Sequence, residues 1–252
     1  MSGHSKWSTI KRAKGAADAK RGKLFTKLIR EIQVSARIGG GDIRGNARLR
    51  DAMAEARANN MPKENIDRAV KRGTGELEGA EFEQITYEGY GPGGTAILIE
   101  SLTDNRNRTV ADLRALMTRN GGNLAEAGSV AWMFEKKGLI SIGKNMAPED
   151  RVMEVALESG ADDIRDEDST WDILTSPSQL EMVKAAIEEA KIPINNASLS
   201  AIPKNTVSLN GEDASKMLKL VDALEDMDDV QKVHANFDIS DDELKQLASK
   251  SD

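Results

Sequence analysis

The chain has 252 residues, of which 35 are lysine or arginine and 42 are aspartate or glutamate, and it contains no cysteine. The lack of cysteine excludes disulfides, thiolate metal sites and cysteine nucleophiles, and it fits a reducing compartment. No apolar run approaches the roughly 20 residues that a membrane-spanning helix needs. We therefore expect a cytoplasmic protein that does not enter a membrane.

The net charge of −7 conceals a strong asymmetry along the chain. Residues 1–73 carry 18 basic and 7 acidic side chains, whereas residues 74–252 carry 17 basic and 35 acidic ones. Such an asymmetry indicates that the basic part meets a polyanion, which would repel the acidic remainder. We expect that polyanion to be a nucleic acid.

The predicted N-terminal domain, residues 1–78, begins with a basic arm over residues 1–22. Apolar residues at helical spacing from Phe25 to Ala36 then predict an amphipathic helix, which glycines 39–41 end. A second apolar stripe covers Leu49–Ala56, and a third follows Pro62 and ends near Gly73. These patterns predict a compact domain of three helices.

Residues 79–134 and 205–240 show similar strand–helix–strand patterns and are predicted to form one discontinuous domain. In the first segment, Thr95–Leu102 is a predicted strand, and Thr109 and Asp112 fit a capping box before a helix through Met117. A further strand is predicted at Ser129–Phe134. The second segment is predicted to contain a strand at Val207–Leu209, a helix at Met217–Leu224 and a strand at Val233–Ile239.

Residues 135–204 form a predicted inserted domain in which strands and helices alternate. Its predicted elements are the strands Leu139–Ile142, Trp171–Leu174 and Ala197–Ile202 and the helices Arg151–Leu157 and Leu180–Ala190. The fold class is therefore predicted to be α+β: an N-terminal three-helix domain followed by two ferredoxin-like α+β domains, one inserted in the other. Residues 241–252 are the predicted C-terminal tail.

The basic residues of the arm and of the first helix are candidate phosphate ligands, because each cation that neutralises a phosphate releases a counterion. Lys23, Lys27 and Arg30 are at helical spacing and predict a basic ridge. Arg106 and Arg108 are predicted in a loop before a helix N-terminus, where they could clamp a phosphate. The alternatives are a solvated tail for the arm and simple turn structure for the arginine loop. The complete candidate set is Lys6, Lys11, Arg12, Lys14, Lys20, Arg21, Lys23, Lys27, Arg30, Arg106 and Arg108.

Motifs for catalysis or cofactor binding are missing from the sequence. Glycines 89–94 match a dinucleotide-binding spacing, but a predicted strand follows them instead of a helix, so they predict a turn. His4 and His234 are far apart, and the acidic clusters at 162–168 and 225–229 lack the spacing of a calcium loop. We expect no enzyme, cofactor or metal, and we expect both acidic clusters to be solvated turns.

Trp132 and Phe134 are predicted to alternate on one strand face. A ferredoxin-like sheet can resemble an RNA-recognition motif, whose aromatic residues stack on bases. The signature of that motif is absent from this sequence. We therefore interpret these two side chains as packing in the core.

Several long strings of the sequence resemble the YebC/PmpR family. They are GHSKW (3–7), DAKRGKLFTKLIREI (18–32), NMPKENIDRA (60–69), YEGYGPGG (87–94) and TDNRNRT (103–109). The resemblance implies a cytosolic protein of three domains. It implies either a DNA-binding transcriptional regulator or a translation factor, since the family includes the mitochondrial translational activator of cytochrome c oxidase and bacterial members that help ribosomes through proline-rich stretches.

The expected function is that of a nucleic-acid-binding regulator of gene expression, with DNA-binding transcriptional regulation as the first reading. No predicted helix presents a set of base-reading side chains, so contacts should be mainly to the backbone, with modest sequence specificity. The alternative is a ribosome-associated factor that binds ribosomal RNA, because A-form RNA is also recognised through its backbone and shape. A carboxylate-based enzyme is the third and least favoured class. The oligomeric state stays open.

Overall fold

The computed structural model describes residues 17–167, 169–240, 242–244 and 247, and of residues 17–20 the backbone alone. The described part of the chain begins with three helices: α2 (Ala17–Gly39), α3 (Ala47–Ala58) and α4 (Lys63–Gly73). Ile32, Leu49 and Ile66, one from each helix, are at most 1% exposed and form the centre of this domain. The predicted helical domain is therefore present, although α2 already includes Ala17, inside the segment predicted to be an arm, whose residues 1–16 lie outside the described residues.

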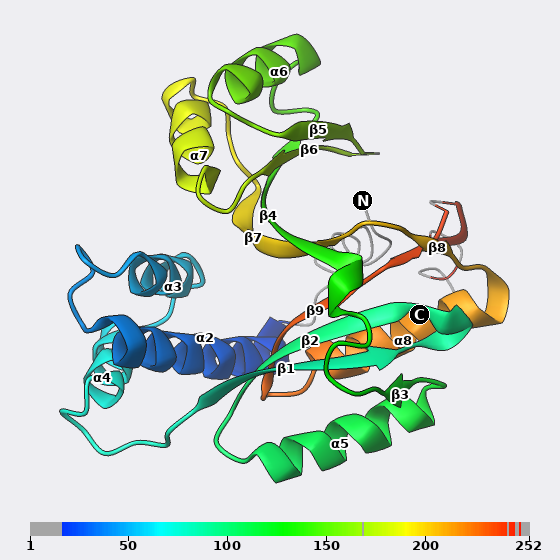
Figure 1. Ribbon diagram of the computed structural model, residues 1–252. Coiled ribbons are helices and arrows are strands. Elements are labelled where there is room, and N and C mark those ends of the chain that lie inside the picture. The colour runs from blue at the N-terminus through cyan, green and yellow to red at the C-terminus, as the bar shows by residue number, and fades with distance from the viewer. Residues whose placement is uncertain (1–16, 168, 241, 245–246, 248–252) are drawn as a thin grey trace.

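The second domain is built on an antiparallel sheet, sheet A, with the strand order β3-β1-β2-β9. Helices α5 and α8 pack on one face of the sheet around Ile99, Leu113 and Leu220 (Figure 1). A short 3-10 turn, η1 (Pro92–Gly94), joins β1 to β2, so glycines 89–94 form a turn before a strand, as predicted. The bounds are β1 (Glu83–Tyr90), β2 (Ala96–Thr103), α5 (Arg106–Arg119), β3 (Asn123–Leu124), α8 (Gly211–Glu225) and β9 (Val230–Ala235).

The third domain is inserted between β3 and α8 and is built on a second antiparallel sheet, sheet B, with the order β5-β6-β4-β7. Helices α6 and α7 cover the face that carries Ile140, Ile142 and Ile173. Its strand–helix–strand–strand–helix–strand sequence and its strand order are those of a ferredoxin-like domain. The bounds are β4 (Phe134–Gly143), α6 (Glu149–Glu158), β5 (Asp163–Asp166), β6 (Thr170–Thr175), α7 (Leu180–Glu189) and β7 (Asn196–Pro203).

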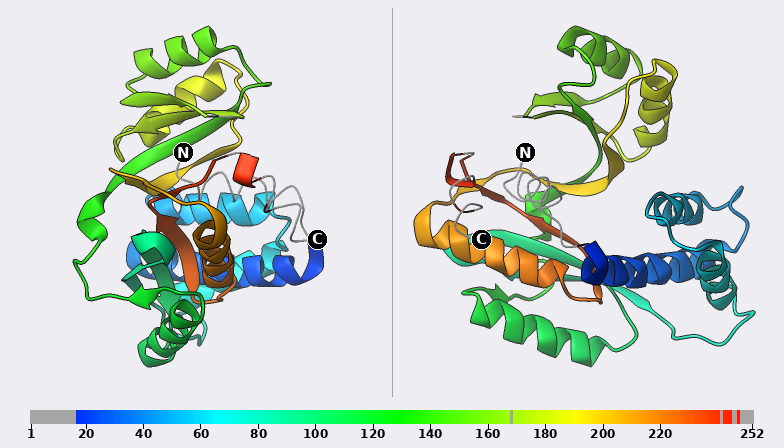
Figure 2. Two further views of the ribbon diagram at one scale, coloured as in Figure 1. Left: turned by 90° about the vertical axis from the view of Figure 1, so that its right-hand side faces the viewer. Right: turned by 180° about the vertical axis from the view of Figure 1, so that it is seen from behind.

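The strands of sheet A occupy the same spatial positions as those of sheet B, but they follow one another differently along the chain. In sheet A, β1 precedes the β2–α5–β3 unit, whereas its counterpart in sheet B, β6, follows the β4–α6–β5 unit. The chain leaves sheet A through β4 and returns through β7, and these strands pair with Phe134 opposite Pro203. Two further short strands, β8 (Val207–Ser208) and β10 (Phe237–Asp238), pair in parallel where the chain re-enters the second domain. Figures 1 and 2 show the inserted domain projecting away from sheet A, with α3 and α4 at one end of the molecule and α8 extending toward the other. Within the described ranges, every helix is too short or too polar to cross a membrane.

The strand predicted at Ser129–Phe134 was wrong. Residues Ala131–Met133 form a 3-10 turn, η2, and the strand begins only at Phe134. The buried carboxylate of Glu88 accepts hydrogen bonds from the backbone N–H groups of Gly128 (2.7 Å), Val130 (2.7 Å) and Ala131 (2.8 Å). These bonds use amides that a strand would need for pairing, so the segment is held as a loop.

The predicted core position of Trp132 was wrong for the same reason, whereas that of Phe134 was confirmed. The 3-10 turn leaves Trp132 64% exposed, while Phe134 is 8% exposed and packs on sheet A. The acidic segment predicted to be a solvated turn also differs, because Asp163–Asp166 pairs with β6 as an edge strand. Charged side chains are common on edge strands, where they discourage further pairing.

Helix α5 begins earlier than the predicted capping box allows. Its N-cap is Asn105, whose side chain accepts a hydrogen bond from the backbone N–H of Arg108 at 3.0 Å. Thr109 lies inside the helix and is fully buried. Arg106 and Arg108 are therefore residues of the first helical turn and not of a preceding loop.

Glu88 provides a test of this loop. Burial raises the pKa of its carboxyl, but the three backbone N–H donors outweigh burial and hold the pKa below its ordinary value. Replacing Glu88 by Ala would leave these amides without their acceptor. We expect Glu88→Ala to lower the free energy of unfolding by about 2–4 kcal/mol, measured by urea denaturation. Exposed Glu126 in the same loop is the control, and Glu126→Ala should change stability by less than about 0.5 kcal/mol.

Candidate nucleic-acid interface

The basic ridge predicted on the first helix is present on α2, but it faces the protein. Lys23, Lys27 and Arg30 all contact the segment Glu225–Asp229 between α8 and β9, called here the acidic turn. The Lys23 ammonium lies 3.2 Å from the carboxylate of Asp226. Lys27 donates a hydrogen bond to the backbone oxygen of Glu225 (2.6 Å), and Arg30 donates to that of Asp228 (2.8 Å). The ridge therefore joins the helical domain to the second domain.

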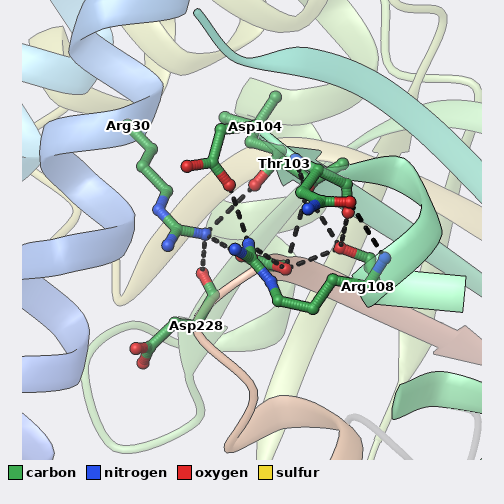
Figure 3. Close-up of polar contacts among 9 residues, drawn as sticks. Arg30, Thr103, Asp104, Arg108 and Asp228 are labelled. Atoms are coloured by element: carbon green, nitrogen blue, oxygen red, sulfur yellow. Dashed lines mark hydrogen bonds and ion pairs between the residues drawn. The ribbon is translucent and has the colours of Figure 1, made fainter. Parts of the chain in front are cut away.

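Asp229 is the centre of this contact. Its side chain is only 8% exposed and accepts hydrogen bonds from Arg30 (2.5 Å), Thr109 (2.6 Å) and Arg108 (3.0 Å). Figure 3 shows Arg30 and Arg108 reaching into this region from their two helices. Arg108 also pairs with Asp104 at 2.7 Å, and Arg30 also donates to the backbone oxygen of Leu102 at 3.1 Å. One carboxylate thus ties α2, the start of α5 and the acidic turn together. This overturns the expectation that the acidic cluster at 225–229 is merely a solvated turn.

The electrostatics of the cluster follow from these contacts. Burial raises the pKa of Asp229, but the hydrogen bonds from Thr109, Arg30 and Arg108 outweigh burial, so its pKa lies below the ordinary value. Burial lowers the pKa of Lys27, and the nearby Glu225 and its acidic neighbours only partly oppose that effect. Arg30 is paired with Asp229 and Lys27 is held by the backbone of the acidic turn, whereas the Lys23–Asp226 pair lies at the surface. A phosphate could replace these partners of Arg30 and Lys27 only by displacing the acidic turn.

The other predicted site residues lie in different places. Lys6, Lys11, Arg12 and Lys14 fall outside the described residues, as does the side chain of Lys20. Arg21 is exposed on the first part of α2. Arg106 is exposed in the first turn of α5, whereas Arg108 beside it is held by Asp104 and Asp229. The two arginines therefore do not converge on one open site in this arrangement.

The structure exposes a second group of cations that were not among the predicted site residues. Helix α4 exposes Lys63, Arg68, Lys71 and Arg72, called here the α4 basic face, and Arg57 is exposed near the end of α3. Within the described residues, none of these five side chains makes an ion pair or a side-chain hydrogen bond. The helical period that buries Ile66 and Ala69 also directs Arg68, Lys71 and Arg72 outward, so their spacing could have identified the face.

The position of this face distinguishes it from the ridge on α2. Helix α2 runs from the acidic turn toward the end of the molecule at which α3 and α4 lie (Figures 1 and 2). The cations nearest the acidic body, the name used here for residues 74–252, are therefore bound by it, and those farther away remain available to an anionic ligand. The acidic residues of α4, Glu64 and Asp67, lie in its first half, so positive charge is concentrated toward its C-terminal end.

His234 is the one histidine among the described residues, and it lies at the junction of the two sheets. Its Nε2 atom is 3.1 Å from Glu100, and its Nδ1 atom is 3.5 Å from the hydroxyl of Ser200 on β7. The second distance is beyond the reach expected for proton abstraction from a serine nucleophile. Among the described residues, no group of three or more His, Asp or Glu side chains is placed to hold a metal ion.

Removing the Asp229 carboxylate tests whether it joins the domains. We expect Asp229→Asn to lower the free energy of unfolding by about 2–4 kcal/mol, because it leaves Arg30 partly buried without its counter-charge. Asp226→Asn is the matched control, since the Lys23–Asp226 pair is exposed and should contribute no more than about 0.5 kcal/mol. Equal effects of the two substitutions in urea denaturation would contradict the special role of Asp229.

The same carboxylate predicts a pH dependence. Its pKa is lower in the folded protein than the ordinary value of 3.8. Its stabilising contribution is therefore complete above that ordinary value and is lost as the pH falls through the lower, folded pKa. We expect the unfolding free energy to decrease below about pH 4 in the wild type, and Asp229→Asn to show a shallower decrease. Urea denaturation across an acidic pH series measures both slopes, and parallel slopes would contradict the expectation.

Comparison with known proteins places the chain in a family. Residues 5–76 match the family model described as the TACO1/YebC protein N-terminal domain, and residues 82–237 match that of the TACO1/YebC second and third domain. A "probable transcriptional regulatory protein" of Geobacter sulfurreducens is 58% identical over 98% of this chain and 100% of its own length. Another protein of that description, from Chloroherpeton thalassium, is 59% identical over 98% of this chain and 99% of its own.

A solved structure supports the same conclusion. The crystal structure of a conserved hypothetical protein from Aquifex aeolicus superposes with a TM-score of 0.82 and 47% sequence identity, covering 89% of this chain and 93% of the other. Its likeness extends over the helical domain and both sheets, given that coverage. The sequence strings that resemble the YebC/PmpR family, the two family models and these relatives agree, and the chain belongs to the TACO1/YebC family.

Proposed function

We propose that this protein regulates transcription by binding DNA through the α4 basic face, Arg57 and the basic residues of segment 1–16. The observation that carries the proposal is the division of the cations into two groups. Those of α2 that face the acidic turn are already paired, whereas those of the α4 basic face have no acidic partner among the described residues. The description of the relatives as probable transcriptional regulatory proteins supports the regulatory role.

Lys71 and Arg72 follow Arg68 by three and four positions on α4, a spacing that places each of them about 5–6 Å from Arg68 on the helix surface. Cations so close together can engage one stretch of phosphate backbone, and each contact releases condensed counterions. Arginine adds directional, bidentate hydrogen bonds to phosphate oxygens. The α4 basic face therefore suits a polyphosphate ligand better than a single small anion.

The remaining surface of α4 offers little for reading bases. Its one amide side chain, Asn65, is partly buried. Specificity for sequence requires hydrogen bonds to base edges, whereas phosphate contacts fix only position and register. We therefore infer backbone-dominated binding. The acidic body would repel the same ligand, so the end of the molecule that carries α3 and α4 should hold most of the phosphate contacts.

The α4 basic face is tested by charge removal. We expect the triple variant Arg68→Gln, Lys71→Gln, Arg72→Gln to bind duplex DNA at least tenfold more weakly in dilute salt. The salt slope is the slope of the logarithm of the binding constant against the logarithm of the salt concentration. The triple variant should reduce its size by up to about 2.7, since each phosphate contact contributes about 0.9. Fluorescence anisotropy with a labelled duplex measures both quantities.

The control for this experiment changes the same charge elsewhere. Lys191, Lys216 and Lys219 are exposed cations of the acidic body, and their triple replacement by Gln should leave DNA binding nearly unchanged. Equal weakening by both triple variants would reduce the effect to net charge and contradict a located interface. Co-sedimentation of the wild type with ribosomes, combined with no retention on duplex DNA at physiological salt, would replace the transcriptional role with one in translation.

A further inference from the structure

Trp132 is exposed in a way that the fold does not require. The residue is 64% exposed, although Val130 and Phe134 on either side of it are 0% and 8% exposed. Val130 and Phe134 pack with Ala96 and Leu98 of sheet A, so the loop already anchors itself without the tryptophan. A single exposed apolar side chain is common on protein surfaces, so the fixed geometry of this turn and the cation beside the ring are what mark it as a contact site.

The exposed ring is held rigidly. Its indole N–H donates to the backbone oxygen of Ser129 at 3.0 Å, and Lys204 donates from its ammonium to the backbone oxygen of Trp132 at 2.9 Å. The Lys204 backbone N–H also donates to the backbone oxygen of Met133 at 2.9 Å. On the other side of the turn, Glu88 binds the amides of Val130 and Ala131. Both ends of η2 are thus fixed, and a preformed site of this kind loses little conformational entropy on binding.

The chemistry of the turn indicates what it can bind. The only hydrogen-bond donor of the indole is already used, so the ring offers its π faces. Planar aromatic ligands stack on such faces, and nucleobases do so regardless of their identity. The Lys204 ammonium in the same turn supplies a cation for a phosphate. A protein-binding hot spot would normally lie within an exposed patch of apolar neighbours, but here the adjoining apolar side chains are buried (Val130), partly buried (Met133) or small (Ala131).

The topology explains why the aromatic residue is placed on this turn. In an RNA-recognition motif, bases stack on the sheet face opposite the helices. In this protein, Ala96 and Leu98 on the corresponding face of sheet A are covered by Val130, Phe134 and Ala201. Stacking on those strands is blocked. Trp132, on the turn that covers them, is exposed, whereas Tyr90 at the same junction is partly buried.

We propose that Trp132 is a stacking platform for an unpaired nucleobase and that Lys204 contacts an adjacent phosphate. The inference rests on the proposed nucleic-acid binding and adds the class of ligand: a single strand, or a duplex with a loop, bulge or extruded base. Inside a perfect duplex both faces of each base are covered by its neighbours, and exposing one costs unstacking energy. Trp132 therefore favours nucleic acid that carries unpaired bases.

The test compares binding of a labelled oligouridylate with that of a perfect DNA duplex of equal length. We expect Trp132→Ala to weaken oligouridylate binding roughly tenfold and to leave duplex binding unchanged, with Trp132→Phe retaining most of the affinity. Bound oligouridylate should quench part of the tryptophan emission of the wild type, and that part should be missing in Trp132→Phe. Lys204→Gln should reduce the salt slope by about 0.7, the contribution of one contact on a single strand.

Leu157→Ala is the matched control, because Leu157 is also an exposed large apolar side chain, 52% exposed, but lies on α6. The Leu157→Ala variant should bind the oligouridylate and the DNA duplex with the affinities of the wild type. Equal oligouridylate affinity for the wild type and Trp132→Ala, both folded by circular dichroism, would overturn the stacking platform and leave the proposed function intact. Failure of the wild type to bind either probe in dilute salt would instead overturn the proposed function itself.

Discussion

The buried carboxylate of Asp229 is the interaction on which the arrangement of the domains depends. A carboxylate in a site that is 8% exposed is costly unless charge partners and hydrogen bonds compensate it. Here Arg30 comes from α2 and Arg108 from α5, so both helices must be in place for the cost to be met. The orientation of the helical domain on sheet A follows from this requirement.

This orientation also distributes the charge of the protein. The acidic turn neutralises the basic residues of α2 that face it, while α3 and α4 extend beyond it (Figure 1). A chain with a net charge of −7 can therefore still present a concentrated positive surface at one end. Because the body and the ligand would repel each other, the same arrangement limits how a polyanion can approach.

Glu88 has a corresponding role at the junction of the two sheets. It holds the loop before β4 through three backbone amides, and β4 and β7 together connect the inserted domain to sheet A. The buried carboxylates Glu88 and Asp229 thus organise the two places where domains meet. The loop held by Glu88 leaves Trp132 exposed at one junction. The contact made by Asp229 leaves the α4 basic face exposed beyond the other.

Local pattern in the sequence determined the helices, most strands and the family. The apolar stripe through Leu28, Ile32 and Ala36 and the alternation of strands and helices depend on neighbours a few residues apart, so they can be read from the chain. The partners of the charged residues could not be read, because Arg30 and Asp229 are 199 residues apart in the sequence. Only the tertiary structure decided that Lys27 and Arg30 are internal contacts, that Trp132 lies outside the core and that the α4 basic face is left available, since burial and charge pairing arise between segments that meet only in the folded chain.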